Sequence, residues 1–167
     1  MLRLVTDVLA LSELDQYEQL PTDDETDMNT ICQLASEVAK DNRQKDVEVL
    51  FEPAKENLLI RSNSERISQV LNNLAHNAAK FTTHGSIRIV YSVLEAEKKI
   101  EISVTDTGIG IPADKQNCVF ERFYKVNSFT QGTGLGLSIS RSIAEKLGGS
   151  LQIDSSYTDG CRIVLTL

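Results

Sequence analysis

Four polar side chains recur at intervals of seven, four and three residues in a segment whose apolar pattern predicts a helix. They are Arg66, Asn73, Asn77 and Lys80, and these intervals place them on one stripe of a helix over 64–81. Asparagine in a helix interior carries a propensity cost without a local gain. Its amide oxygen can bind a hard cation such as Mg²⁺, and a lysine one turn further on can meet phosphate as a point charge. The pattern predicts a polar rim over a cavity, with a solvated helix face as the alternative.

A second group of candidates follows a predicted strand that ends at Val104. Segment 106–112 reads DTGIGIP, and Gly108 and Gly110 let the backbone approach a flat ligand closely. A buried carboxylate at Asp106 would accept a hydrogen bond from an exocyclic amine. The alternative is an ordinary glycine-rich turn in which Asp106 is only a turn former.

A third candidate is the glycine-rich segment 131–138, QGTGLGLS, which precedes a predicted helix. Three alternating glycines before a helix N-terminus present free N–H groups and the positive end of the helix dipole to an anion. The spacing fits neither the dinucleotide-binding fingerprint nor the GxxxxGK[ST] phosphate loop. The alternative is a flexible connector that ends in a glycine N-cap.

Helices and strands must bring these three segments together. Apolar periodicity predicts helices at 1–19, 28–43, 64–82 and 135–147, and alternation predicts strands at 47–51, 58–60, 87–93, 100–104, 150–154 and 161–167. A capping box at 62–65 should open the third helix, and Gly148 and Gly149 should close the fourth. The segment 83–85 is predicted as a turn, and the acidic stretch 20–27 as a linker with a short strand at its end. This order fits an α+β two-layer sandwich with one sheet and helices on one face.

The predicted first helix has an unusually wide apolar face. One apolar stripe contains Leu2, Val5 and Leu9, and a second contains Leu4, Val8 and Leu11. Together they cover well over half of the helix circumference, whereas a helix docked on one side shows a narrower face. This pattern predicts a bundle or coiled-coil helix whose partners lie outside the chain. The alternative is a helix wrapped by its own domain.

Composition excludes several classes of function. The chain has 167 residues, 41% of them hydrophobic, and a net charge of −7, which argues against binding to nucleic acid or to an anionic membrane. It contains no apolar run long enough to span a membrane and no secretory signal pattern. Cys32, Cys118 and Cys161 lack disulfide or zinc spacing and are predicted to be buried or incidental thiols in a reducing compartment. Only two histidines are present, which limits histidine-based chemistry.

Taken in order, the motifs resemble a known family. The runs NNLAHNAAKFT (72–82), DTGIGIP (106–112), FERF (120–123) and GTGLGLS (132–138) resemble the N, G1, F and G2 boxes of the sensor histidine kinase catalytic domain. That domain belongs to the GHKL, or Bergerat-fold, ATP-binding superfamily, with a mixed, mostly antiparallel sheet. LVTDVLALSELD (4–15) resembles the end of the second helix of the kinase dimerisation domain. The resemblance implies a dimerisation-helix remnant over 1–19, a linker over 20–27 and an ATP-binding catalytic domain over 28–167.

The resemblance implies specific roles around Mg²⁺ and ATP. Asn77 should hold Mg²⁺, with Asn73 and Lys80 near the phosphates as catalytic residues. Asp106 should hydrogen-bond the adenine amino group, with Gly108 and Gly110 framing the base.

The resemblance also implies a mobile lid over the nucleotide at 112–133. Phe120 and Phe123 should pack this lid down. The glycine-rich segment should hinge it and bind phosphate at the helix start, through Gly132, Thr133, Gly134, Leu135 and Gly136. Arg122 and Lys125 are weaker candidates for the γ-phosphate, because a solvated charge is the expected fate of each.

The resemblance further implies phosphoryl transfer to a histidine on a dimerisation helix absent from this chain, and relay to an aspartate of a response regulator. Hydrolytic members of the superfamily carry a glutamate four residues before the Mg²⁺-binding asparagine; here that position is Asn73, whose amide cannot act as a general base. Neither histidine has an acceptor context: His76 is expected on the surface, with an indirect role near the phosphates as the alternative, and His84 in a turn. A degenerate nucleotide-binding module without phosphotransfer is the alternative function.

Several expectations concern the whole protein. The isolated chain should be a monomer or weak dimer that binds ATP or ADP but barely phosphorylates itself. The parent is expected to be a homodimer anchored in the inner membrane, with this domain in the cytoplasm and without direct membrane contact.

Overall fold

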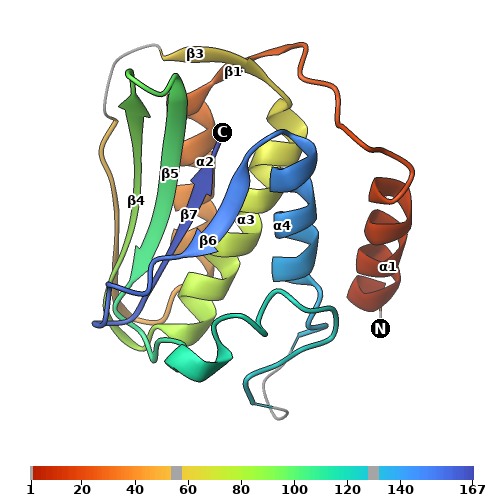
Figure 1. Ribbon diagram of the computed structural model, residues 1–167. Coiled ribbons are helices and arrows are strands. Elements are labelled where there is room, and N and C mark those ends of the chain that lie inside the picture. Colours follow the sequence, from red (N-terminus) through yellow and green to blue (C-terminus); the bar gives the residue numbers. More distant parts are fainter. Residues whose placement is uncertain (1, 54–57, 128–131) are drawn as a thin grey trace.

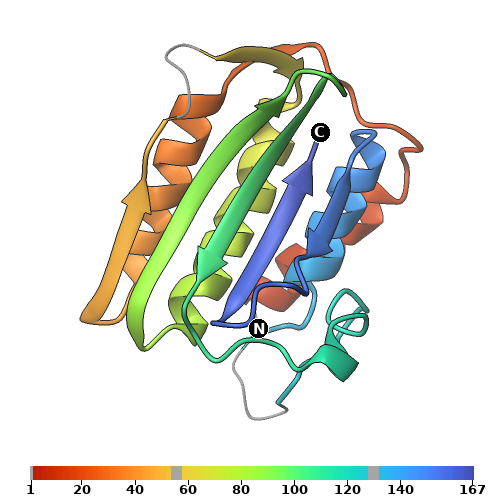
Figure 2. The same cartoon turned by 60° about the vertical axis from the view of Figure 1, so that its left-hand side comes forward.

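In the computed structural model, which describes residues 2–53, 58–127 and 132–167, three helices cover one face of a five-stranded sheet (Figures 1 and 2). The helices are α1 (Leu2–Leu14), α2 (Met28–Asn42), α3 (Ser64–Phe81) and α4 (Gly136–Lys146), with a short 3-10 turn at Ala113–Lys115. The strands are β1 (Asp24–Asp27), β2 (Asp46–Phe51), β3 (Leu59–Ser62), β4 (His84–Leu94), β5 (Lys99–Asp106), β6 (Ser150–Ile153) and β7 (Cys161–Thr166). Helices α2, α3 and α4 form the layer on the sheet, and α1 packs against α4 at the periphery.

The main sheet has the strand order β2-β4-β5-β7-β6. The pair β2–β4 is parallel and the other pairs are antiparallel, so the predicted α+β class with a mixed, mostly antiparallel sheet is confirmed. The prediction of a single sheet is wrong in one respect, because β1 and β3 form a separate two-stranded ribbon. The strand at the end of the acidic linker therefore pairs outside the main sheet.

Helix α3 forms the centre of the helical layer. Its predicted apolar stripe is buried through Ile67, Val70, Leu71, Leu74 and Ala78, which anchors one side of the helix on the sheet. The predicted capping box is displaced by one residue: the N-cap is Asn63, whose Oδ1 accepts from the backbone N–H of Arg66 at 3.1 Å. The other end caps at Thr82, as predicted.

Two sequence predictions at element boundaries are wrong. The first helix ends at Leu14, before the predicted residue 19, because the apolar periodicity stops there and Tyr17 closes a turn onto the Leu14 carbonyl. His84 was predicted to lie in a turn, but it is the first residue of β4, because it pairs with Asp46 in the parallel register of β2 and β4. The predicted turn is correspondingly shorter.

Helix α1 is only half covered. Leu11 and Leu14 are buried, whereas Leu2, Val5 and Leu9 are 83%, 57% and 63% exposed. This distribution agrees with an apolar face too wide for one neighbour. No helix in the described part of the chain combines the length and apolar character needed to cross a bilayer.

The three thiols are free, as predicted. Cys32 lies in the core, where burial raises its pKa to about 12.

Candidate nucleotide site

A cavity of about 490 Å³ opens between α3, the ends of β5 and β7, and the segment that leads into α4. Its volume lies in the range of small-molecule sites. Of the predicted site residues it brings together Asn73, Asn77, Lys80, Asp106, Gly110, Gly132, Thr133, Gly134 and Gly136. Three segments separated in the sequence by up to about sixty residues therefore share one cavity, as their motifs predicted.

Asp106 lines the cavity where β5 ends, and this part of the wall is called here the Asp106 end. The antiparallel register places it at the end of β5, opposite Cys161 at the start of β7. It is 7% exposed, and its Oδ1 accepts hydrogen bonds from the backbone N–H groups of Gly108 (2.9 Å) and Cys161 (3.3 Å). No hydrogen bond to Oδ2 is present among the described residues, so one carboxylate oxygen remains available for a ligand donor. Burial raises the pKa of Asp106, and the two backbone hydrogen bonds partly oppose that rise.

Gly108 shapes the turn that holds Asp106 but does not line the cavity. A Cβ at this position would lie 2.3 Å from the carbonyl oxygen of Phe81, and the next residue, Ile109, donates its N–H to the same oxygen. The loop after β5 is therefore pressed against the end of α3. Gly110, two residues on, does line the cavity, so of the two glycines expected to frame a ligand, one contacts the cavity and the other allows the close approach.

The asparagines of α3 face the start of α4. The side-chain amide of Asn73 donates to Ser140 Oγ at 3.0 Å, and a Cβ at Gly136 would come within 2.4 Å of Asn73 Oδ1. Asn73 is thereby fixed over the first turn of α4, because its amide nitrogen is held by that helix. Asn77, one turn further along α3, lines the cavity beside it.

Positive charge gathers in one part of the cavity wall, called here the cationic end. Arg3, Lys80 and Lys125 line it, no charge of theirs acts on Asp106, and none of the three has an ion pair in the described parts of the chain. Partial burial, together with the charges of Arg3 and Lys125, lowers the pKa of Lys80. Three neighbouring cations without ion pairs make this part of the wall locally positive in a chain whose net charge is −7.

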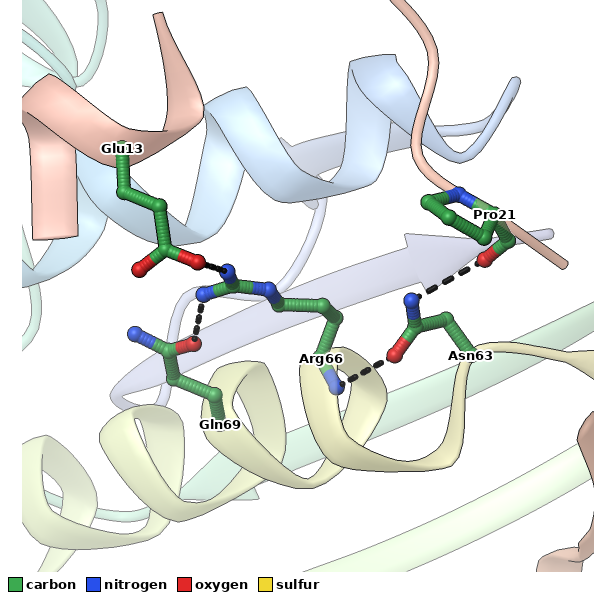
Figure 3. Close-up of polar contacts among 5 residues, drawn as sticks. All are labelled: Glu13, Pro21, Asn63, Arg66 and Gln69. Carbon is green, nitrogen blue, oxygen red and sulfur yellow. Dashed lines mark hydrogen bonds and ion pairs between the residues drawn. The ribbon is translucent and has the colours of Figure 1, made fainter. Parts of the chain in front are cut away.

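Arg66, the first member of the predicted polar stripe, lies outside the cavity. Its guanidinium contacts Glu13 of α1 at 2.8 Å and Gln69 of α3 at 3.0 Å (Figure 3). It therefore fastens α1 to α3, while the other three stripe residues face the cavity.

The two phenylalanines expected to pack the predicted lid down differ in burial. Phe120 is partly buried against the core and lies under the Arg141 guanidinium at 4.7 Å, as expected for a residue that packs the lid down. Phe123 is 61% exposed, which does not fit the same expectation. Arg122 pairs with Asp15 at 3.3 Å and does not line the cavity. The segment 128–131, which includes Gln131, lies outside the described residues.

Residues of the glycine-rich segment differ in whether they line the cavity. Gly132 and Gly134 line the cavity with φ of 129° and 74°. Leu135 is fully buried in the core and is not among the residues that line the cavity. Thr133 lines the cavity, and its hydroxyl donates to Asp7 Oδ2 of α1 at 2.6 Å.

The expectation that His76 lies on the surface is wrong. It is half-buried between the nucleotide cavity and a second, polar hollow of about 500 Å³ among α1, α3 and α4. Burial, and secondarily the charge of Arg3, lower its pKa. Packing of α1 creates this environment, and the pattern within α3 alone does not reveal it.

Sequence reasoning missed other cavity residues. Ile109, Ile111, Val119 and Val126 are apolar positions of the loop after β5 that line the cavity, and an apolar residue in a loop is a signal that could have identified them. Arg3 and Asn42 come from α1 and the end of α2, and no local pattern links either to the cavity.

Residues 62–167 match the family described as histidine kinase-, DNA gyrase B- and HSP90-like ATPases. The chain therefore belongs to this family. Within it the chain is an ATPase catalytic domain of the kind found in sensor histidine kinases, and the resemblance of its motifs is confirmed.

Two relatives are similar in sequence. The chain is 32% identical over 172 residues to the sensor histidine kinase WalK of Bacillus subtilis. This alignment covers 100% of this chain and 28% of WalK. It is 41% identical over 115 residues to the autoinducer 2 sensor kinase/phosphatase LuxQ of Vibrio cholerae, across 65% of this chain and 13% of LuxQ. The chain thus spans less than a third of either relative.

The fold is also that of solved kinases. The structure of full-length ShkA in complex with AMPPNP aligns with a TM-score of 0.80 at 24% identity, over 98% of this chain and 34% of that one. At this identity the likeness concerns the fold.

Proposed function

We propose that this chain binds ATP with Mg²⁺ and, as the catalytic part of a larger sensor kinase, transfers the γ-phosphoryl group to a histidine. The observation that carries the proposal is the polarity of the cavity. A buried carboxylate with one available oxygen lines one part of the wall, and three cations without an ion pair among the described residues line another, since the charges of Arg3 and Lys125 act on Lys80 and none of the three acts on Asp106. An adenine nucleotide has the matching polarity, with an amine donor at the base and negative charge at the phosphates.

Asp106 would recognise the base. Its Oδ1 is held by two backbone N–H groups, which orient the carboxylate, and its Oδ2 would accept from the exocyclic amine. Val104 and Ile163, on neighbouring strands, line the same part of the cavity wall and would cover the faces of the ring with apolar surface.

Asn77 fits a magnesium ligand. Mg²⁺ usually takes one or two protein oxygens and completes its shell with phosphate oxygens and water, and the described residues contain no cluster of three acidic, histidine or cysteine side chains that would form a full protein cage. When bound, the ion would neutralise charge on the phosphates. Lys80 would add a point charge to them, and Thr133, Gly134 and Gly136 would surround their far side.

Asn73 favours transfer over hydrolysis. Its amide cannot take a proton from water, and its Nδ2 is already engaged with Ser140. Phosphoryl transfer can proceed by positioning and charge stabilisation alone. The acceptor imidazole nitrogen would bond to the γ-phosphorus as the bond to the β–γ bridging oxygen breaks, and ADP would leave with that oxygen.

The acceptor is proposed to lie elsewhere in a larger protein, because the chain spans only 28% of WalK. We assign residues 1–19 to a dimerisation helix, 20–27 to a linker and 28–167 to the catalytic domain. The phosphohistidine would then pass its phosphoryl group to an aspartate of a response regulator. The exposed apolar residues of α1 support a helical partner.

The test measures binding and transfer separately. Calorimetry should detect ATP and ADP binding in the presence of Mg²⁺, and the chain alone with γ-labelled ATP should neither incorporate label nor release phosphate rapidly. Addition of a separately expressed dimerisation domain with an acceptor histidine should give acid-labile phosphohistidine. Label on His76 or His84, or brisk phosphate release from the chain alone, would contradict the proposed transfer. Binding without transfer to any acceptor would favour the degenerate module.

A further inference from the structure

Helix α1 is fastened to the catalytic domain along its length. Asp7 accepts the hydrogen bond from Thr133, Leu11 and Leu14 are buried, and Glu13 pairs with Arg66. Figures 1 and 2 both show the N-terminal end of α1 beside the segment that leads into α4. The first turn of α1 is therefore held at the edge of the nucleotide cavity, although it lies far from the other cavity residues in the sequence.

Arg3 lies one helical turn before Asp7 and lines the cavity. The two residues share the inner face of α1, since both also line the polar hollow. The Asp7 carboxylate is engaged by the Thr133 hydroxyl, and Arg3 forms no ion pair within the described ranges. A charged side chain that could have been neutralised by its neighbour instead faces the cavity unpaired.

The surroundings of Arg3 need an anion. Lys80 and Lys125 also line the cavity, and the charges of Arg3 and Lys125 act on Lys80. The only carboxylate among the described lining residues is Asp106, on which none of these cations acts. Like charges gathered on one wall repel each other unless a ligand neutralises them. A guanidinium presents donors in a planar fork that matches phosphate oxygens, and it keeps its charge at any physiological pH.

We infer that Arg3 is a phosphate-binding residue of the nucleotide site, supplied by α1 from outside the family-matched residues 62–167. This inference rests on the proposed function. It makes docking of α1 and nucleotide binding mutually dependent: bound phosphates hold the first turn of α1 in place, and displacement of α1 removes one cation from the phosphates.

The test compares nucleotides with and without phosphates on variants of the full chain. Arg3→Ala should weaken Mg·ATP binding about tenfold, the scale of one charge-assisted hydrogen bond, and Arg3→Glu should weaken it more. Arg3→Lys, which keeps the charge but loses the planar fork, should bind with an affinity between those of the wild type and Arg3→Ala. Adenosine affinity should be the same in all of them. Arg61→Ala, at an exposed arginine of β3 outside the cavity, is the matched control and should bind Mg·ATP like the wild type.

Hydrogen exchange provides a second readout that does not depend on the variants folding identically. Mg·ATP should slow amide exchange in the first two turns of wild-type α1, and adenosine should not. Two results would overturn the role of Arg3. One is an Mg·ATP affinity that is unchanged in both Arg3→Ala and Arg3→Glu, and the other is an amide exchange rate in α1 that Mg·ATP does not alter. If Asn77→Ala still weakened Mg·ATP binding in that case, the proposed function would stand without Arg3. A wild-type chain that binds no adenine nucleotide would overturn both.

Discussion

The two ends of the nucleotide cavity are built by different means. At the Asp106 end, strand register and two backbone hydrogen bonds fix a buried carboxylate. At the cationic end, the charges come from long side chains on α1, α3 and the lid, and no ion pair in the described chain restrains them, although Lys80 lies over the Phe81 ring at 5.3 Å. The first end is formed by the main chain before any ligand arrives, whereas the second is held in a state of mutual repulsion that a ligand would relieve.

This difference separates recognition of the base, at the Asp106 end, from the response of side chains to phosphate, at the cationic end. A group fixed by the sheet can select the base without moving, because its direction is set by hydrogen bonds within the fold. Side chains that repel each other are positioned to change when phosphate binds. We therefore expect substitutions at the Asp106 end to weaken the binding of every adenine ligand. Substitutions at the cationic end should weaken only the binding of ligands with phosphates.

The largest effect is expected for Asp106→Asn. Loss of the charge, and an NH₂ donor facing the adenine amino group, should weaken binding of both ATP and adenosine about 100-fold. Calorimetry with the two ligands measures this directly. Glu101→Gln, on the same strand but outside the cavity wall, is the control and should bind normally. Equal adenosine affinity in Asp106→Asn and wild type would remove Asp106 from recognition of the base.

Alanine substitutions at Gly108 and Gly148 test whether the Asp106 end of the cavity depends on the close approach of the loop after β5 to the end of α3. Gly108→Ala places a Cβ 2.3 Å from the Phe81 carbonyl oxygen, and backbone atoms cannot move aside cheaply, so unfolding free energy should fall by about 2–3 kcal/mol. Gly148→Ala, with φ of 84° but open space around it, should cost about 1 kcal/mol from conformation alone. Urea unfolding gives both values.

The same pair also separates stability from binding. Only Gly108→Ala should lower adenosine affinity, because only that turn orients Asp106. Equal losses of stability, or normal adenosine binding by the folded Gly108→Ala protein, would show that the turn tolerates a side chain.

Asn77→Ala tests the cationic end. Loss of a magnesium ligand should weaken Mg·ATP binding about tenfold, the scale of one polar contact to a charged group, and leave adenosine binding unchanged. Removal of Mg²⁺ with a chelator should lower the wild-type affinity for ATP to that of the variant. Asn72→Ala, on α3 but outside the nucleotide cavity, is the matched control. A Mg²⁺ dependence that survives in Asn77→Ala would assign the ion to other residues.

Periodicity and motif order predicted most of the rigid end. The spacing of apolar residues located α3, and the position of Asp106 after an alternating segment predicted a buried carboxylate at a strand end. Both features depend on local pattern and on the pairing of neighbouring strands, which the sequence records directly. The separate β1–β3 ribbon escaped prediction because its strands are far apart in the sequence: Asp27 and the Leu59 opposite it are 32 positions apart, with a helix and a strand between them.

The cationic end was predicted less completely, for a physical reason. Lys80 and the glycines carry a local signal, but Arg3 and the burial of His76 depend on where α1 docks. That docking is decided by Leu11, Leu14 and contacts such as Glu13–Arg66, which join residues more than fifty positions apart. The exposure of Phe123 likewise follows from packing of the lid and not from its aromatic character.

The smallest expected effect concerns pH and again distinguishes the fixed end. Burial raises the pKa of Asp106 above its ordinary value of 3.8, so the folded chain binds this proton more tightly than the unfolded chain. The contribution of Asp106 to stability should therefore fall as pH rises from 3.8 through the raised pKa, and then level off. Cys161, beside it, has a pKa raised to about 12 and does not titrate in this range. Adenosine binding should run the other way and strengthen with pH, because a proton on Oδ2, the oxygen not held by backbone N–H groups, turns the acceptor that the amine needs into an O–H donor. Urea unfolding of wild type and Asp106→Asn across the acidic range, with adenosine titrations at each pH, would show these opposite slopes; parallel stability curves for the two proteins would mean that the carboxyl titrates alike in the folded and unfolded chains.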